Sequence, residues 1–244
     1  MLLAAELEQA QSLLRAQKVR EAWNALLPLL AREQSNREAL LLAGRIQLAL
    51  DDVGAAKKFL RGAVAIDSGY FPAQFLLGFC LYVDNDFTPA LSALETARKL
   101  KPGDGATLLY LALTYEGLAD PVKALEVYPL AVRLHTSAEA PLAYARLLYN
   151  LGRFDEAQKL VSESLRRDSK YREAHYEQAR LYFEAGRNAQ CVASGELALQ
   201  LPGLEQTLRP IHHLLSRAYQ RLGKAEEAQK HRDVFEKIPP RLIR

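Results

Sequence analysis

The side chains that could do acid–base or metal chemistry are few and scattered. The five histidines are His135, His175, His212, His213 and His231. None stands in an HExxH pattern or in a ligand pair at helical spacing, which a metal site on a helix would need. His212 and His213 are adjacent, so on one helix they point to different faces, and we expect one packed and one solvated. The histidines therefore predict no metal site.

The other candidates for chemistry have structural explanations. Cys80 and Cys191 stand far apart in apolar stretches, without CxxC spacing or a convincing His partner, and are expected to be buried. The "DND" of residues 84–86 falls at a turn between two predicted helices, where Asp and Asn cap and turn locally. The "PGDG" of residues 102–105 follows a helix and lacks the third glycine of a phosphate-binding loop. We therefore predict a protein that is not an enzyme and uses no metal or cofactor.

Composition is that of a soluble, core-forming chain, with 49% apolar and 25% charged residues. The net charge of +3 is too small to indicate nucleic-acid binding, although residues 207–244 hold nine Lys and Arg against four Asp and Glu. The longest apolar stretch, residues 71–83, is too short for a membrane span, and the start lacks the basic region of a signal peptide. With two cysteines that look unpaired, these features favour a cytoplasmic location.

A seven-residue sequence motif, called the phrase below, recurs along the chain. The "LGRFDEA" of residues 151–157 returns as "LGKAEEA" at residues 222–228. A period in this range marks a repeat architecture in which each repeat is one supersecondary element, here two apolar-periodic helices around a turn. Aligning the last residue of the phrase gives steps of 34, 34, 34, 33, 34 and 37 between Ala22, Ala56, Ala90, Ala124, Ala157, Cys191 and Ala228.

The repeat resembles the tetratricopeptide repeat in its length and in its small residues at repeat positions 8, 20 and 27. Small side chains there let helices approach closely. Position 8 holds Ala10, Gly44, Gly78, Ala112, Ala145, Ala179 and Ser216. Position 27 of the five middle repeats holds Ala63, Ala97, Ala131, Ser164 and Ala198. Position 11 is aromatic at Tyr115, Tyr182 and Tyr219, and position 32 is proline at Pro102 and Pro240.

The resemblance implies an all-α, right-handed α-solenoid of antiparallel helix pairs, about fourteen helices in all. We expect one continuous domain over residues 1–244. End repeats have one neighbour and are expected to act as polar caps, and Glu6 and Arg232 stand at positions that are apolar or small in the family pattern. The predicted repeats are residues 3–36, 37–70, 71–104, 105–137, 138–171, 172–205 and 209–242.

The resemblance also implies that positions 2, 5, 9 and 12 of each first helix, with position 6 beside them, face a concave groove. Contiguous apolar side chains there indicate a partner surface, unless the winding of the superhelix buries some of them. Arg at position 9 can grip carboxylates, unless it pairs with Glu139, Glu173 or Glu177. The predicted apolar contacts are Leu41, Phe75, Leu76, Phe79, Tyr82, Leu109, Tyr110, Leu113, Tyr149, Tyr176 and Phe183. The predicted arginine contacts are Arg45, Arg146, Arg180 and Arg217.

The predicted function is a non-catalytic scaffold or adaptor that binds a protein or peptide segment of unknown identity in this aromatic, Arg-flanked groove. One alternative is a regulatory or targeting module of a larger enzyme or assembly machine. Another is nucleic-acid binding through the basic C-terminal end, which is less favoured because the groove lacks a regular polar code in each repeat. A homodimer closed through the apolar groove also stays open.

Overall fold

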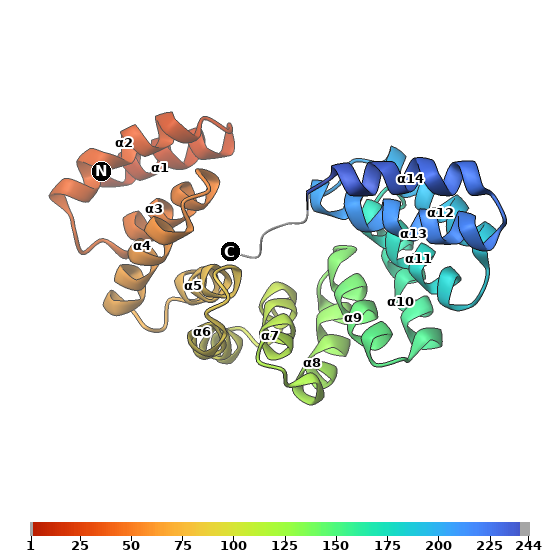
Figure 1. Ribbon diagram of the computed structural model, residues 1–244. Coiled ribbons are helices and arrows are strands. Elements are labelled where there is room, and N and C mark those ends of the chain that lie inside the picture. The colour runs from red at the N-terminus through yellow and green to blue at the C-terminus, as the bar shows by residue number, and fades with distance from the viewer. Residues whose placement is uncertain (1, 240–244) are drawn as a thin grey trace. The chain divides into compact units, whose positions relative to one another are not determined.

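The computed structural model describes residues 2–239, which contain fourteen α-helices, one short 3-10 helix and no strand (Figure 1). Pro240 and the end of the seventh predicted repeat lie outside these residues. The helices are α1 (Leu2–Arg15), α2 (Val19–Arg32), α3 (Arg37–Ala49), α4 (Val53–Ile66), α5 (Phe71–Val83), α6 (Phe87–Leu100), α7 (Gly105–Gly117), α8 (Pro121–Leu134), α9 (Glu139–Asn150), α10 (Phe154–Arg167), α11 (Arg172–Glu184), α12 (Asn188–Gln200), η1 (Glu205–Thr207), α13 (Leu208–Arg221) and α14 (Ala225–Lys237).

Contacts along the backbone divide the chain into two compact units, Met1–Leu134 and His135–Arg244. The N-terminal unit holds α1 to α8 and the C-terminal unit holds α9 to α14. Within each unit, every helix packs against the next one in sequence. The predicted fold class, an all-α solenoid of antiparallel helix pairs, is confirmed within each unit. That all seven repeats form one domain over residues 1–244 stays a prediction.

The turn inside each helix pair has the same backbone geometry in all seven repeats. One residue of each turn takes a positive φ, between 56° and 74°. The next residue donates its N–H to a carbonyl five residues back, as from Arg153 to Leu148 at 2.8 Å, which is the bond that closes a Schellman motif. The residues at positive φ are Gln17, Asp51, Asn85, Ala119, Gly152, Gly186 and Gly223, and they follow the same steps as the sequence repeat.

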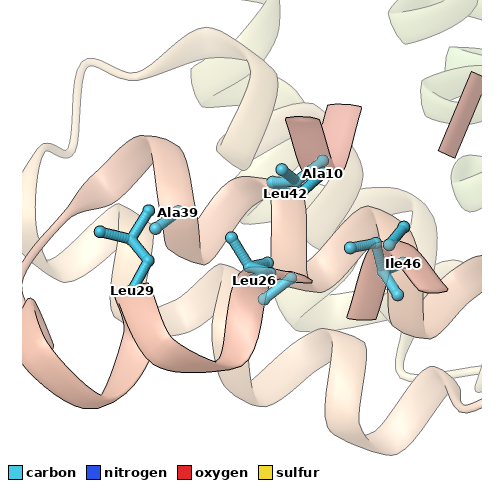
Figure 2. Packing of buried hydrophobic residues seen from close by; sticks show 8 residues of the cluster. Ala10, Leu26, Leu29, Ala39, Leu42 and Ile46 are labelled. Atoms are coloured by element: carbon cyan, nitrogen blue, oxygen red, sulfur yellow. The ribbon is translucent and has the colours of Figure 1, made fainter. Parts of the chain in front are cut away.

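Small residues are buried where the two helices of a pair meet. Ala56, Ala90 and Ala124, all at position 20, are completely buried. A Cβ atom added to Gly78 would lie 2.6 Å from the Cγ atom of Leu94, so this pair of helices packs closer than an alanine would allow. Each layer of the core is completed by leucines of the second helix. Figure 2 shows the first layer, in which Leu26 and Leu29 of α2 lie near Ala10, Ala39, Leu42 and Ile46.

The insertion before the seventh repeat is held by two buried charged residues of α11. Arg172 donates from Nε to the carbonyl of Leu201 at 2.7 Å and also bonds the carbonyls of Ala198 and Leu204. Glu173 accepts the N–H of Leu204 at 2.8 Å. These bonds satisfy backbone groups that the end of α12 leaves without helical partners. The three extra residues therefore form an ordered connection between α12 and α13.

Candidate partner-binding surface

Four aromatic side chains from two first helices gather on one surface of the N-terminal unit. We call Phe75, Phe79, Tyr82 and Tyr110 the aromatic cluster. The three residues of α5 are four and three positions apart, so they share one face of the helix. The ring of Tyr110, on α7, has its centroid 6.1 Å from Phe75, 4.9 Å from Phe79 and 5.6 Å from Tyr82. All four side chains remain half-buried, so each keeps part of its ring in contact with solvent.

The inner side of the aromatic cluster belongs to the core. Phe79 and Tyr82 pack against buried residues of the N-terminal unit, and so do the predicted contacts Leu41 and Leu76. Leu113 of α7 is also half-buried. The four residues that pack on the core, Leu41, Leu76, Phe79 and Tyr82, therefore have one face in the core and remain partly exposed.

Two aromatic residues that the sequence analysis did not name extend the aromatic cluster. Phe71 stacks on Phe75 with ring centroids 6.3 Å apart, and Phe87 of α6 lies 6.0 Å from Tyr82. The spacing of Phe71, four residues before Phe75, was a signal that could have identified it. Phe87 begins the second helix of its repeat, whereas all the predicted groove positions lie on first helices.

The C-terminal unit brings together a second group of predicted residues, which we call the arginine–tyrosine cluster: Arg146 and Tyr149 of α9 with Tyr176, Glu177 and Arg180 of α11. Glu177 is buried and binds both arginines, at 2.8 Å from Arg146 Nε and 2.6 Å from an Arg180 guanidinium nitrogen. The Arg180 guanidinium lies 3.8 Å from the Tyr149 ring centroid. Burial raises the pKa of Tyr176 to about 12, so its phenol is neutral at physiological pH.

The sequence left open whether these arginines pair with an acid of the protein, and the structure shows that two of them do. Of the three candidate acids, Glu177 binds Arg146 and Arg180, whereas Glu173 binds the insertion. One carboxylate faces two guanidinium groups, so the trio keeps one formal positive charge. Arg146 retains a side-chain exposure of 41%, against 25% for Arg180.

The other predicted contacts differ in their exposure. Leu109 and Phe183 are buried, with exposures of 0% and 2%. The Phe183 ring is covered by two guanidinium groups, that of Arg221 at 3.7 Å and that of Arg217 at 4.7 Å. Arg45 is exposed and lines a pocket of about 320 Å³ on the first two repeats.

The described residues hold few groups in a state suited to catalysis. Residues 2–239 contain no group of three His, Cys, Asp or Glu side chains placed to hold a metal ion. Burial raises the pKa of the Cys80 thiol to about 11 and that of the Cys191 thiol to about 12, so neither forms a reactive thiolate at neutral pH. His212 is half-buried and His213 exposed, as expected for adjacent helical residues. In residues 2–239, no helix combines the length and the apolar character that crossing a membrane requires.

Comparison with known proteins agrees with this architecture. The family model of the tetratricopeptide repeat matches residues 7–71 and 142–201, about half of the chain. The chain therefore belongs to the tetratricopeptide repeat family, whose members are generally non-catalytic scaffolds that bind protein or peptide partners. No match to a curated protein sequence was found.

Solved structures with the same fold cover nearly the whole chain. The Cut9–Hcn1 hetero-tetramer of the APC/C aligns with a TM-score of 0.81 and 16% identity over 96% of this chain and 46% of that one. A tetratricopeptide repeat protein from Parabacteroides merdae aligns with a TM-score of 0.74 and 17% identity over 98% and 93%. YrrB, described as having an unusual peptide-binding site, aligns with a TM-score of 0.59 and 19% identity over 80% and 98%. This chain thus spans less than half of the Cut9–Hcn1 chain it matches, and at these identities the likeness concerns the fold.

Proposed function

We propose that this protein is a non-catalytic interaction scaffold that binds a segment of a partner protein on its first-helix surface. The aromatic cluster of α5 and α7 is the main apolar contact. The observation that carries the proposal is that Tyr110 gathers three aromatic side chains of α5, and all four stay half-buried after the repeats have packed. Large aromatic side chains with a rigid, partly covered base dominate the energy of many interfaces.

We include three leucines near the aromatic cluster in the proposed partner-binding surface. Leu41, Leu76 and Leu113 are half-buried on the first helices of three consecutive repeats, α3, α5 and α7. We leave Leu109 and Phe183 out of the proposed contact because both are buried. YrrB, a tetratricopeptide repeat protein with an unusual peptide-binding site, supports this type of partner by family likeness.

The arginine–tyrosine cluster is proposed as the polar contact. Glu177 and Tyr149 fix the guanidinium of Arg180 before any partner arrives, which lowers the conformational entropy lost on binding. Arg146 shares Glu177 and is partly exposed, so a carboxylate of the partner can bind its remaining N–H groups. We expect this contact to contribute specificity more than affinity, since a partly solvated charge pair is screened.

Partner capture with a matched control tests the proposal. Purified protein is used to capture partners from the source cell, and the affinity of the identified partner is then measured against two double variants. Replacing Phe79 and Tyr110 by Ala removes the centre of the aromatic cluster. Replacing Trp23 and Phe59 by Ala removes an aromatic pair of similar geometry, 5.7 Å between centroids, on the second helices α2 and α4.

We expect the first double variant to weaken binding by about a hundredfold or more, and the control to bind as the wild type does. Circular dichroism checks that both variants keep their helices. Loss of binding only in the Trp23 and Phe59 variant would place the partner site on the second helices instead. A dimeric wild type that becomes monomeric on replacing Phe79 and Tyr110 would assign the aromatic cluster to self-association.

A further inference from the structure

A small pocket lies on the last repeat, between α13 and α14, away from the residues proposed above. Its volume is about 200 Å³. Pockets for drug-sized ligands are larger, at roughly 300–1,000 Å³, so this one suits a single side chain or one small charged group. The lining residues are His213, Ser216, Arg217 and Gln220 of α13 with Arg232, Phe235 and Glu236 of α14.

Polar residues replace the small or apolar ones found at the same positions of earlier repeats. Position 24 holds Arg232, whereas no charged residue stands there in the six preceding repeats. Position 8 holds Ser216, whereas those repeats have Ala or Gly. Ser216 is only 5% exposed, lines the pocket, and makes no hydrogen bond through its hydroxyl to any residue from 2 to 239. The Ser216 hydroxyl is not among the enclosed polar atoms that lack a partner in the described residues, so it stays open to the pocket and can bond water or a ligand.

The pocket carries unneutralised positive charge. Neither Arg217 nor Arg232 has a carboxylate within ion-pair distance among the described residues, and Glu236 is the one acid in the lining. Partial desolvation of its ring against neighbouring side chains lowers the pKa of His213, although the residue is exposed, and the nearby charges of Arg217 and Arg209 lower it further.

Three basic side chains in or near the pocket, those of Arg209, His213 and Arg217, contact aromatic rings. The Arg209 guanidinium lies 4.0 Å from the ring centroid of Phe235, and the His213 ring lies 4.8 Å from the same ring. Arg217 lies over Phe183. Contacts of this kind position the side chains without neutralising their charge. These contacts therefore restrain Arg217 and His213 before a ligand enters the pocket.

We propose that this pocket binds an oxyanion, a carboxylate or a phosphate group, through the guanidinium groups of Arg217 and Arg232 and the hydroxyl of Ser216. Guanidinium groups bind both anions with paired, charge-assisted hydrogen bonds. The Ser216 hydroxyl, which lines the pocket, donates an additional bond, and Phe235 forms the apolar wall. The site is independent of the aromatic cluster, so it can be present whether or not a partner binds there.

The test uses the full chain, with inorganic phosphate and acetate as the two probes and chloride at equal ionic strength as the reference. NMR spectra that resolve the Arg Nε–Hε groups and the His213 ring are recorded along each titration. We expect saturable shifts at Arg217, Arg232 and His213 with at least one probe. The Arg217→Gln, Arg232→Gln double variant should raise the apparent dissociation constant at His213 at least tenfold. Saturation by phosphate alone would identify phosphate as the ligand, and saturation by acetate would identify carboxylate.

Two further variants keep this test decisive. Arg187→Gln is the control, because Arg187 is an exposed arginine of the same unit that does not line the pocket, and it should bind as the wild type does. Ser216→Ala introduces a residue that four other repeats carry at this position, so it should fold and bind several-fold more weakly. Absence of saturation with both probes, or equal binding by the double variant and the wild type, would overturn the proposal.

Discussion

The rings of Tyr110 and Phe79 meet edge to face, with centroids 4.9 Å apart and planes inclined at 75°, although they belong to neighbouring repeats. This contact joins α5 to α7 on the first-helix surface. The same two rings have a structural role within the unit and the proposed role in binding, and the two roles can be separated by measuring stability without a partner.

We predict that Phe79 and Tyr110 stabilise the fold cooperatively, with a coupling free energy of about 0.5–1.5 kcal/mol, as for other aromatic pairs. A double-mutant cycle with Phe79→Ala and Tyr110→Ala in urea unfolding measures it. Phe79→Ala combined with Trp23→Ala is the reference, because rings without a shared contact should give additive effects within about 0.5 kcal/mol. Additivity in both cycles would mean that the edge-to-face contact does not contribute to stability.

We predict that Ala119→Gly stabilises the protein by a few tenths to about 1 kcal/mol. Ala119 has φ 56°, a conformation that costs an L-residue energy and that glycine adopts freely. The repeat at Gly186 already has glycine at this position, so Gly186→Ala should destabilise by about 1 kcal/mol or more. Thermal or urea unfolding measures both changes.

The control for this pair is Ala193→Gly, an exposed position in the middle of α12. Glycine in a helix interior should destabilise by about 0.5–1 kcal/mol. Opposite signs for Ala119→Gly and Ala193→Gly would attribute the gain to backbone conformation. The same sign at both positions would contradict the explanation.

The fold could be predicted from the sequence because each repeat is specified by residues close together along the chain. Each helix pair needs small residues at fixed positions and one turn residue at positive φ, and both recur at the same steps along the chain. The spacing of Phe75, Phe79 and Tyr82 likewise placed them on one helix face. Their contact with Tyr110 follows from the register between successive repeats.

The sequence could not predict which side chains of the first-helix stripe are buried, because that depends on residues far away along the chain. Phe183 is covered by Arg217 and Arg221, which lie on α13 beyond the insertion. For the same reason, the sequence could not predict that Glu177 is the acid that binds Arg146 and Arg180. Glu173 was an equal candidate by spacing, but it binds the insertion, which has no counterpart in the other repeats.

We predict that Ala90→Leu and Ala124→Leu each destabilise the protein by roughly 1–3 kcal/mol, the cost of overpacking a close contact. Both alanines are completely buried at position 20. Ala189→Leu is the control, since Ala189 is exposed on α12 and the change should stay within about 0.5 kcal/mol. Urea unfolding gives all three values. Unchanged stability of both buried variants would show that the contact can relax.

We predict that Glu177→Gln destabilises the protein by about 1.5–3 kcal/mol, the range for hydrogen bonds to charged groups. The substitution keeps the shape of the side chain but leaves Arg146 and Arg180 without a carboxylate. Because Glu177 is buried, the loss should change little between low and high salt. Glu184→Gln is the control, because Glu184 is exposed and binds the hydroxyl of Tyr149. An equal, small effect of both changes would mean that the buried ion pairs are replaceable.

A chain of polar contacts holds α14 against α12 and α13. The Nδ1 atoms of His212 and His231 are 2.9 Å apart, so one ring must donate and the other accept. Nε2 of His231 lies 2.9 Å from a carboxylate oxygen of Glu196, which also accepts the hydroxyl of Tyr219 at 3.0 Å. Both histidines charged at once would place two donors against each other, and the arrangement therefore favours a neutral His212.

We predict that the protein loses stability below about pH 6.5, partly through His212. Burial lowers the pKa of His212, and the neighbouring His231 lowers it further, whereas Glu196 acts in the opposite direction. A histidine whose folded-state pKa lies below its unfolded value binds fewer protons when folded. Its contribution to stability is therefore complete above the unfolded pKa of about 6.5 and is lost as the pH falls toward the lowered folded value. His213, whose pKa is lowered by partial desolvation of its ring and by Arg217 and Arg209, adds to the same trend.

Urea unfolding at pH 7.5, 6.5 and 5.5 measures this loss in the wild type and in His212→Gln. We expect the variant to lose less stability over this interval, because glutamine can offer a hydrogen bond to His231 and does not titrate. His135→Gln is the control, since His135 lies outside this chain of contacts and its ring bonds Ser137; it should keep the pH dependence of the wild type. If His212→Gln shows the full wild-type loss, the proton uptake must come from other groups and the role assigned to His212 is wrong.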